Sequence, residues 1–159
     1  MTVFRLSGLE IEFLINILFC LLAGFLIGIE RSSTGKPAGV STHSFVMAGA
    51  MIFTMISLFI DSNQPARVAA QIVSGVGFLG AGIIITQGEK VSNLTTAASI
   101  WFSAAIGMAI GLQLYFFAIL GVCFALIVPK LSWYVKRQVE DKTLDLPLIT
   151  PVRKDEQKK

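Results

Sequence analysis

The chain has few charged residues. Asp, Glu, Lys and Arg make up 14% of its 159 residues, whereas about 25% is typical of a soluble domain. Hydrophobic residues make up 54%, and the mean hydropathy is +0.74. This composition excludes an ordinary soluble domain and indicates an integral membrane protein.

Reactive side chains are also scarce. Cys20 and Cys123 lie in apolar runs without metal-binding spacing, which is typical of buried free thiols. The single histidine, His43, has no Cys, Asp or Glu close by in the sequence, so it is a poor metal ligand. We favour a capping or interfacial role for it over a pH switch. No set of nucleophile, base and orienting group is present, so we expect no enzymatic activity, no cofactor and no bound metal.

One motif could mislead. Residues 75–80 spell G-x-G-x-x-G, a pattern found in dinucleotide-binding loops. That loop also needs a strand-to-helix turn and an acid about 20 residues later, but the next acid after Glu89 is Glu140. Because residues 68–88 carry no charge, we interpret the glycines as helix-packing residues of a membrane span.

Five apolar segments predict an all-α bundle of about five transmembrane helices. The first three cover about residues 13–29, 44–60 and 68–86. Residues 91–129 contain no charge, but one helix of that length would be about 58 Å long, roughly twice the hydrocarbon thickness. We therefore expect a turn at residues 111–113, between spans at about 94–110 and 114–133. Asn93 is expected to cap the fourth span, and Pro129 to kink or end the fifth.

The positive charges predict the orientation. Eight of the 13 Lys and Arg residues follow Pro129, and an orientation with the N-terminus outside and the C-terminus inside leaves only Arg5 and Arg67 outside. The positive-inside rule favours this arrangement. We expect a transmembrane domain at residues 1–135 and a short, basic, mobile tail at 136–159. The basic charge is assigned to orientation and lipid contact and not to nucleic acid.

Small residues recur at helical spacing. They predict close helix packing at Gly24 and Gly28 in the first span, at several glycines of the third, and along the fourth. The two small faces of the third span predict a central helix packed on both sides. In the fourth span, Thr95, Ser99, Ser103, Gly107 and Gly111 follow one another at four-residue intervals. This ridge is either a packing surface or a polar seam lining a pathway. The packing candidates are Gly24, Gly28, Gly75, Gly77, Gly80, Gly82, Gly107 and Gly111.

Glu30 and Arg31 form the most informative charged pair, because they directly follow the Gly24/Gly28 face at the edge of a span. They are either interfacial anchors or a fixed contact between the bundle and the loop that follows. The functional candidates are Glu30, Arg31, His43, Gln71, Asn93, Thr95, Thr96, Ser99 and Ser103.

Three segments resemble the MgtC/SapB family of bacterial membrane proteins. They are GFLIGIER (24–31), AGVSTHSFVMAGA (38–50), and RVAAQIVSGVGFLGAGIII followed by LTTAASIWFSAAIGMAIG (67–111). Two positions depart from the family pattern: Ser41 replaces an arginine, and Asn93 replaces a glycine. Many members also carry a soluble domain after the last helix.

The resemblance implies a non-enzymatic role in adaptation to low magnesium and, in some pathogens, in virulence. It also implies residence in the bacterial inner membrane and regulation of another membrane complex such as ATP synthase. We expect the lipid bilayer and either a membrane-protein partner or a second copy of the chain as partners. The alternative is a small ion or solute transporter that uses a polar seam between the third and fourth spans. The absence of charge deep in a span favours regulation, because ion pathways usually place Asp, Glu or His there.

Overall fold

The structure is a computed structural model that describes residues 8–60, 66–87 and 90–144. Its helices are α1 (Gly8–Ser33), α2 (Val40–Ile60), α3 (Ala66–Ile83), α4 (Leu94–Gly111) and α5 (Tyr115–Leu144). Each contains a stretch long and apolar enough to cross a membrane. The prediction of an all-α membrane protein with five spans is therefore confirmed.

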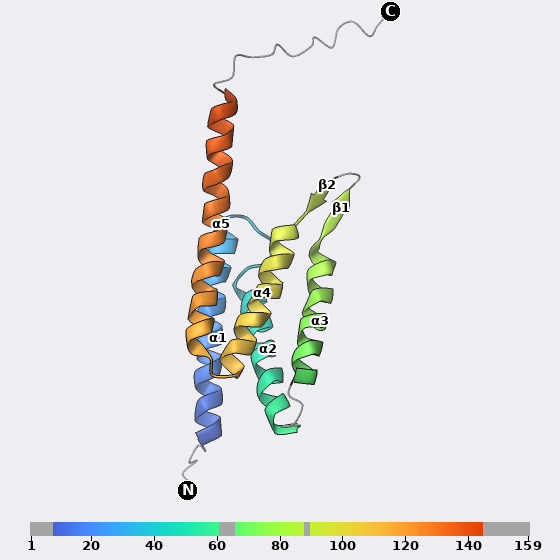
Figure 1. The fold of residues 1–159 in the computed structure, drawn as a ribbon, viewed down its shortest axis with the longest axis vertical. Coiled ribbons are helices and arrows are strands. Elements are labelled where there is room, and N and C mark those ends of the chain that lie inside the picture. Colours follow the sequence, from blue (N-terminus) through green and yellow to red (C-terminus); the bar gives the residue numbers. More distant parts are fainter. Residues whose placement is uncertain (1–7, 61–65, 88–89, 145–159) are drawn as a thin grey trace, which may run out of the picture. The chain divides into compact units, whose positions relative to one another are not determined.

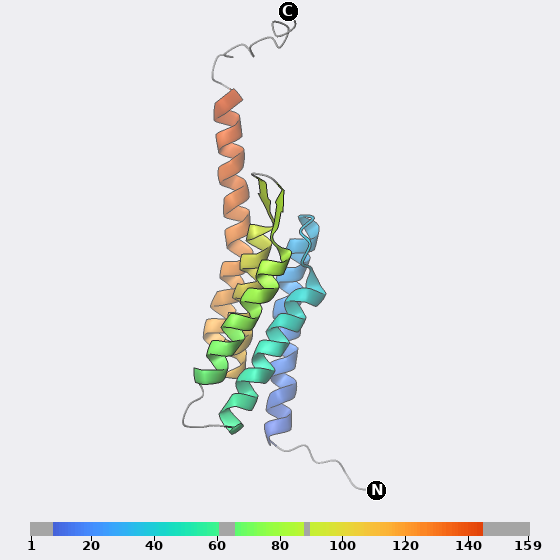
Figure 2. The ribbon, with the colours of Figure 1, turned by 90° about the vertical axis from the view of Figure 1, so that its right-hand side faces the viewer.

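Helices α1 to α4, with α5 up to Leu126, pack as one unit. Successive helices run in opposite directions (Figures 1 and 2). One end of this unit, where α1 ends and α2 and α4 begin, we call the Arg31 end. The other, where α1 begins and α2 and α4 end, we call the Glu10 end.

The residues from Ile127 onward form a second unit. Its described part continues α5 as a helix to Leu144, with Pro129 inside the helix. The helix therefore does not end at the proline, and it extends into the expected tail. The rest of that tail, residues 145–159, lies outside the described residues.

The contact between α2 and α4 forms the centre of the first unit. A side chain built on Gly107 would meet the backbone of Met47, and one built on Gly111 would meet the backbone of Met51. Met47 and Met51 have no exposed surface. Because both pairs are separated by the same sequence offset, the two helices run parallel and stay in contact over successive turns.

Helix α1 packs against α2 in the opposite direction. A Cβ atom on Gly24 would overlap Ser44, and one on Gly28 would overlap Val40. Backbones that come this close leave no room for a side chain, which is the usual role of small residues in membrane helices. The contact brings the end of α1 beside the start of α2.

Helix α3 lies at the side of the unit and not at its centre. Within α3 only Ile72 and Gly80 are buried, and Gly80 faces Ala97 of α4. Space is open beside Gly75, Gly77 and Gly82, where a built Cβ meets no atom within 4 Å. The expectation that α3 is packed on both sides by its own chain is therefore wrong. A small-residue face indicates a close neighbour without showing whether that neighbour belongs to the same chain.

A short hairpin replaces the end of the predicted third span. Helix α3 ends at Ile83, and strands β1 (Ile85–Gln87) and β2 (Lys90–Ser92) pair in antiparallel register, with Ile85 opposite Ser92. The span was expected to continue to residue 86. The hairpin lies at the Arg31 end, between α3 and α4 (Figure 1).

The turn predicted between the last two spans is confirmed. It lies between Gly111 and Tyr115, and the N–H of Leu114 donates to the carbonyl of Ala109. Gln113 adopts the left-handed conformation, with φ 60°. The first part of α5 then packs on α4, where Gly121 faces Ile106.

The close α2–α4 contact predicts the effect of adding one methyl group. Gly107→Ala should lower the midpoint of thermal unfolding in detergent, because overpacking costs about 1–3 kcal/mol. Gly77→Ala is the matched control, since its new methyl group meets open space and alanine favours a helix over glycine by about 1 kcal/mol. Circular dichroism measures the unfolding midpoint of each purified variant. Equal midpoints for Gly107→Ala and Gly77→Ala would contradict this packing.

Candidate functional site

Arg31 connects the end of α1 to the start of α4. Its side chain is 4% exposed, and its Nη2 donates a hydrogen bond of 3.0 Å to Oγ1 of Thr96. Thr96, in the first turn of α4, has no exposed surface. The arginine predicted as an edge residue is thus buried within the unit and joins helices that are far apart in the sequence.

His43 makes a second link, from α2 to α4. The ring is fully buried, and its Nδ1 lies 2.8 Å from Oγ of Ser103. The Ser103 hydroxyl donates to the carbonyl of Ser99, so it is free to accept a hydrogen bond from Nδ1–H. This assignment leaves Nε2 of His43 buried and without a partner.

The polar residues of α4 therefore form a row along its inner side, which we call the polar row: Thr96, Ser99 and Ser103. The Ser99 hydroxyl donates to the carbonyl of Thr96, so both serines satisfy their hydroxyl protons within the helix. The row faces Arg31 and His43 and hence lies on the α1 and α2 side of α4. The alternative interpretation places a seam between the third and fourth spans, but Ile72 of α3 and Ala104 of α4 belong there to one apolar cluster.

Glu30 and Arg31 are neighbours without forming an ion pair. The Glu30 carboxylate attracts the Arg31 guanidinium electrostatically, without a hydrogen bond between them. Oε2 of Glu30 is buried and has no hydrogen-bond partner. The backbone ties the following loop to this point, because the N–H of Lys36 donates to the carbonyl of Arg31 at 3.0 Å. This geometry corresponds to a fixed contact between loop and bundle.

Three other candidates lie away from the polar row. Gln71 and Thr95 are exposed. Asn93 precedes α4 but makes no side-chain capping bond, and its Nδ2 donates instead to the carbonyl of Ile83 at 3.3 Å. Asn93 therefore occupies the predicted N-cap position, but the expected side-chain capping bond is not made. Asn93 adopts a left-handed conformation, with φ 65°, which glycine and asparagine tolerate best.

A third polar contact between helices was missed by the sequence reasoning. The hydroxyl of Tyr115 donates to Oδ1 of Asn16 at 2.8 Å, and Nδ2 of Asn16 lies 3.5 Å from Sδ of Met55. Asn16 is fully buried. A lone amide within an apolar span is costly unless it is paired, so Asn16 could have been identified from the sequence, although its partner could not.

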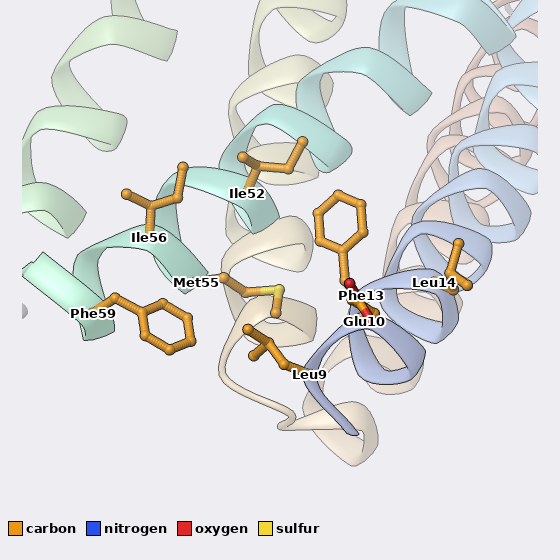
Figure 3. Close-up of a pocket in the computed structure, with 8 residues that line it drawn as sticks. All are labelled: Leu9, Glu10, Phe13, Leu14, Ile52, Met55, Ile56 and Phe59. Atoms are coloured by element: carbon orange, nitrogen blue, oxygen red, sulfur yellow. The ribbon is translucent and has the colours of Figure 1, made fainter. Parts of the chain in front are cut away.

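The Glu10 end contains an apolar cavity of about 450 Å³ between α1 and α2 (Figure 3). Glu10 is the only charged residue lining it, and its apolar lining includes Phe13, Met55 and Phe59. The polar row takes no part in this cavity. Within the described ranges, no three His, Cys, Asp or Glu side chains come together as a metal site would require.

Comparisons with known proteins agree with one another. The model of the MgtC family matches residues 17–138. The chain is 45% identical over 104 residues to protein MgtC of Salmonella typhimurium strain LT2, which covers 65% of this chain and 45% of that protein. It is 45% identical over 108 residues to protein MgtC of Brucella abortus strain 2308, covering 67% and 45%.

A longer match is to the Escherichia coli K12 protein named "Putative magnesium transporter YhiD". The two are 36% identical over 146 residues, which covers 86% of this chain and 68% of that protein. The chain thus matches slightly less than half the length of the curated MgtC proteins. No solved structure matches it.

The link between Arg31 and Thr96 predicts a difference between two adjacent threonines. Thr96→Val removes the acceptor of Nη2 while keeping the side-chain volume, and a buried donor without a partner costs about 1–3 kcal/mol. Thr95→Val makes the same change at an exposed position. Thermal unfolding in detergent should show a lower midpoint for Thr96→Val only. Similar midpoints for the two variants would show that the hydrogen bond does not stabilise the bundle.

Proposed function

Because the chain belongs to the MgtC family, we propose that it is a non-enzymatic, multi-pass protein of the bacterial inner membrane that regulates another membrane complex. The regulation would serve adaptation to low magnesium and, in a pathogen, survival in the host. The family resemblance makes ATP synthase the first complex to examine. The chain would act through contacts between membrane helices.

The observation that carries this proposal is the outward face of α3. We define this face by its exposed small residues: Ala70, Ser74, Gly75, Gly77, Ala81 and Gly82. Phe78 is also exposed on α3, between Ser74 and Gly82, whereas the outward sides of α1 and α5 carry mostly large apolar residues such as Leu18, Leu22, Phe116 and Leu120. Large side chains suit contact with lipid, whereas small ones allow another helix to approach closely.

The exposed amide of Gln71 lies beside this face, near Ser74 and Gly75 on the helix surface. An amide that faces hydrocarbon gains by hydrogen bonding to a neighbouring helix. A partner helix on α3 would therefore cover both the small residues and the amide.

The polar row supports regulation over catalysis. His43 is bonded to Ser103, and within the described residues neither of them has a carboxylate as a hydrogen-bond partner. Such a pair lacks the orienting acid that activates a nucleophile or a base.

A transporter is the second candidate function. The name of the Escherichia coli relative supports it, as does the buried charge of Arg31 beside the polar row, because charged groups inside membrane proteins often mark ion pathways. The substrate would be Mg²⁺ or a solute whose movement is linked to it.

For the orientation we propose that the N-terminus is outside and the C-terminus inside, as the positive charges favour. The Arg31 end would then face the cytoplasm. In a variant without Cys20 and Cys123, an impermeant thiol reagent applied to intact cells should label Arg5→Cys and leave Lys159→Cys unlabelled. The opposite pattern would reverse the orientation.

The regulatory proposal predicts the effect of filling the outward face of α3. Gly75→Leu should leave membrane insertion and protein level unchanged, because the side chain meets open space. It should nevertheless abolish the growth advantage in low magnesium and the recovery of a crosslinked partner from membranes. Ala105→Leu, on the exposed side of α4, is the control and should retain both.

Magnesium flux in reconstituted vesicles separates the two functions. Regulation predicts no flux above that of empty vesicles. Saturable flux that Gly75→Leu leaves unchanged would overturn the regulatory proposal and support the transporter.

A further inference from the structure

Within the described residues, Arg31 forms no ion pair. Only one of its five N–H donors has a hydrogen-bond acceptor in the described part of the chain, the hydroxyl of Thr96. Its Nε is buried without a partner, and Glu30 forms no ion pair with it. Arginine keeps its proton in proteins, and in the described part of the chain this buried charge is offset only by the electrostatic attraction of Glu30.

The surrounding backbone adds positive charge of its own. The Arg31 side chain extends from the last turn of α1, where a cation is favourable, to the first turn of α4, where it is not. The first amides of α4 have no partners within the helix, and the side chain of Asn93 does not cap them. Helix α2 also begins at this end, at Val40. A cation and two helix N-termini therefore lie at one end of the bundle.

The loop that follows α1 carries a second cation, Lys36. The loop between α1 and α2 folds back so that the amide of Lys36 donates to the carbonyl of Arg31, and Lys36 is exposed. An unpaired arginine, a lysine and a helix N-terminus are the groups with which proteins bind oxyanions.

From this arrangement we propose that the Arg31 end of the bundle binds a phosphate group. Arg31 supplies the buried donor, and Lys36 and the first amides of α4 complete the site. Phosphate has several acceptor oxygens that match the planar guanidinium. The site lies where helices reach the edge of the membrane, so the phosphate comes either from the headgroup of an anionic lipid or from free phosphate in solution. The site is independent of which of the two functions above is right.

The test uses the full chain purified in phosphate-free detergent. Its thermal unfolding midpoint is followed while one of two probes is added, phosphatidylglycerol or inorganic phosphate. Diacylglycerol, which lacks the phosphate, and chloride at equal ionic strength are the respective controls. A saturable rise with phosphatidylglycerol alone identifies a lipid headgroup as the source, and a saturable rise with inorganic phosphate identifies free phosphate.

Variants locate the site. Arg31→Gln should raise the dissociation constant for the phosphate probe by at least about tenfold, because it removes a charge-assisted hydrogen bond. Arg67→Gln, an exposed arginine of α3 at the Glu10 end, should leave binding unchanged. If Arg31→Gln does not fold, Lys36→Gln replaces it, because Lys36 is exposed, and should weaken binding several-fold.

Two results would overturn the proposal. One is the absence of a saturable rise with either probe in the unaltered chain. The other is an equal loss of binding in the Arg67 variant and in the Arg31 or Lys36 variant, because this would indicate general attraction between a basic protein and an anion.

Discussion

The rest of the structure depends on the close approach of α2 and α4. Two glycines of α4 lie against the backbone of Met47 and Met51, where no side chain fits. His43 and Ser103 are 60 positions apart, and the same offset relates Met47 to Gly107. A single register between two parallel helices therefore sets both the apolar core and the histidine–serine contact. Helix α1 then packs on α2, which carries Arg31 to the first turn of α4.

Because of this register, the polar row, Arg31 and His43 face one another and not the lipid. The hydroxyls of Thr96 and Ser103 join helices, because they pair with Arg31 and His43, whereas the Ser99 hydroxyl bonds within α4. The small residues serve two different purposes. Those of α1 and α4 bring helices of the same chain together, whereas most of those of α3 lie on the outside. A regulator that acts through helix contacts needs this division between a closed interior and an open outer face.

Much of the fold could be predicted from the sequence, because charge-free runs in a membrane protein indicate spans. The turn near Gly111 followed from the length of one such run, and the four-residue spacing of Ser99, Ser103 and Gly107 indicated one continuous side of a helix. The hairpin at residues 85–92 could not be predicted, because its strands are three residues long and Ile85 continues the apolar run of α3.

The partners of the site residues were also beyond sequence reasoning. Arg31 and Thr96 are 65 positions apart, and Asn16 and Tyr115 are 99 apart, so their pairing follows only from the packing of the helices between them. Glu30 is adjacent to Arg31 in the sequence, and the two form no ion pair. Adjacent residues of a helix point in different directions, and this explains why that pairing does not occur.

The central claim is that the polar row is a closed packing contact and not an aqueous pathway. Thiol accessibility tests it most directly, in a variant in which Cys20 and Cys123 are replaced by serine. Ser103→Cys, at a position that is 1% exposed, should resist a small hydrophilic thiol reagent in open membranes, while Thr95→Cys, one residue before the row, should react. Rapid labelling of Ser103→Cys, slowed by added Mg²⁺, would show that the row lines a pathway and would contradict the account.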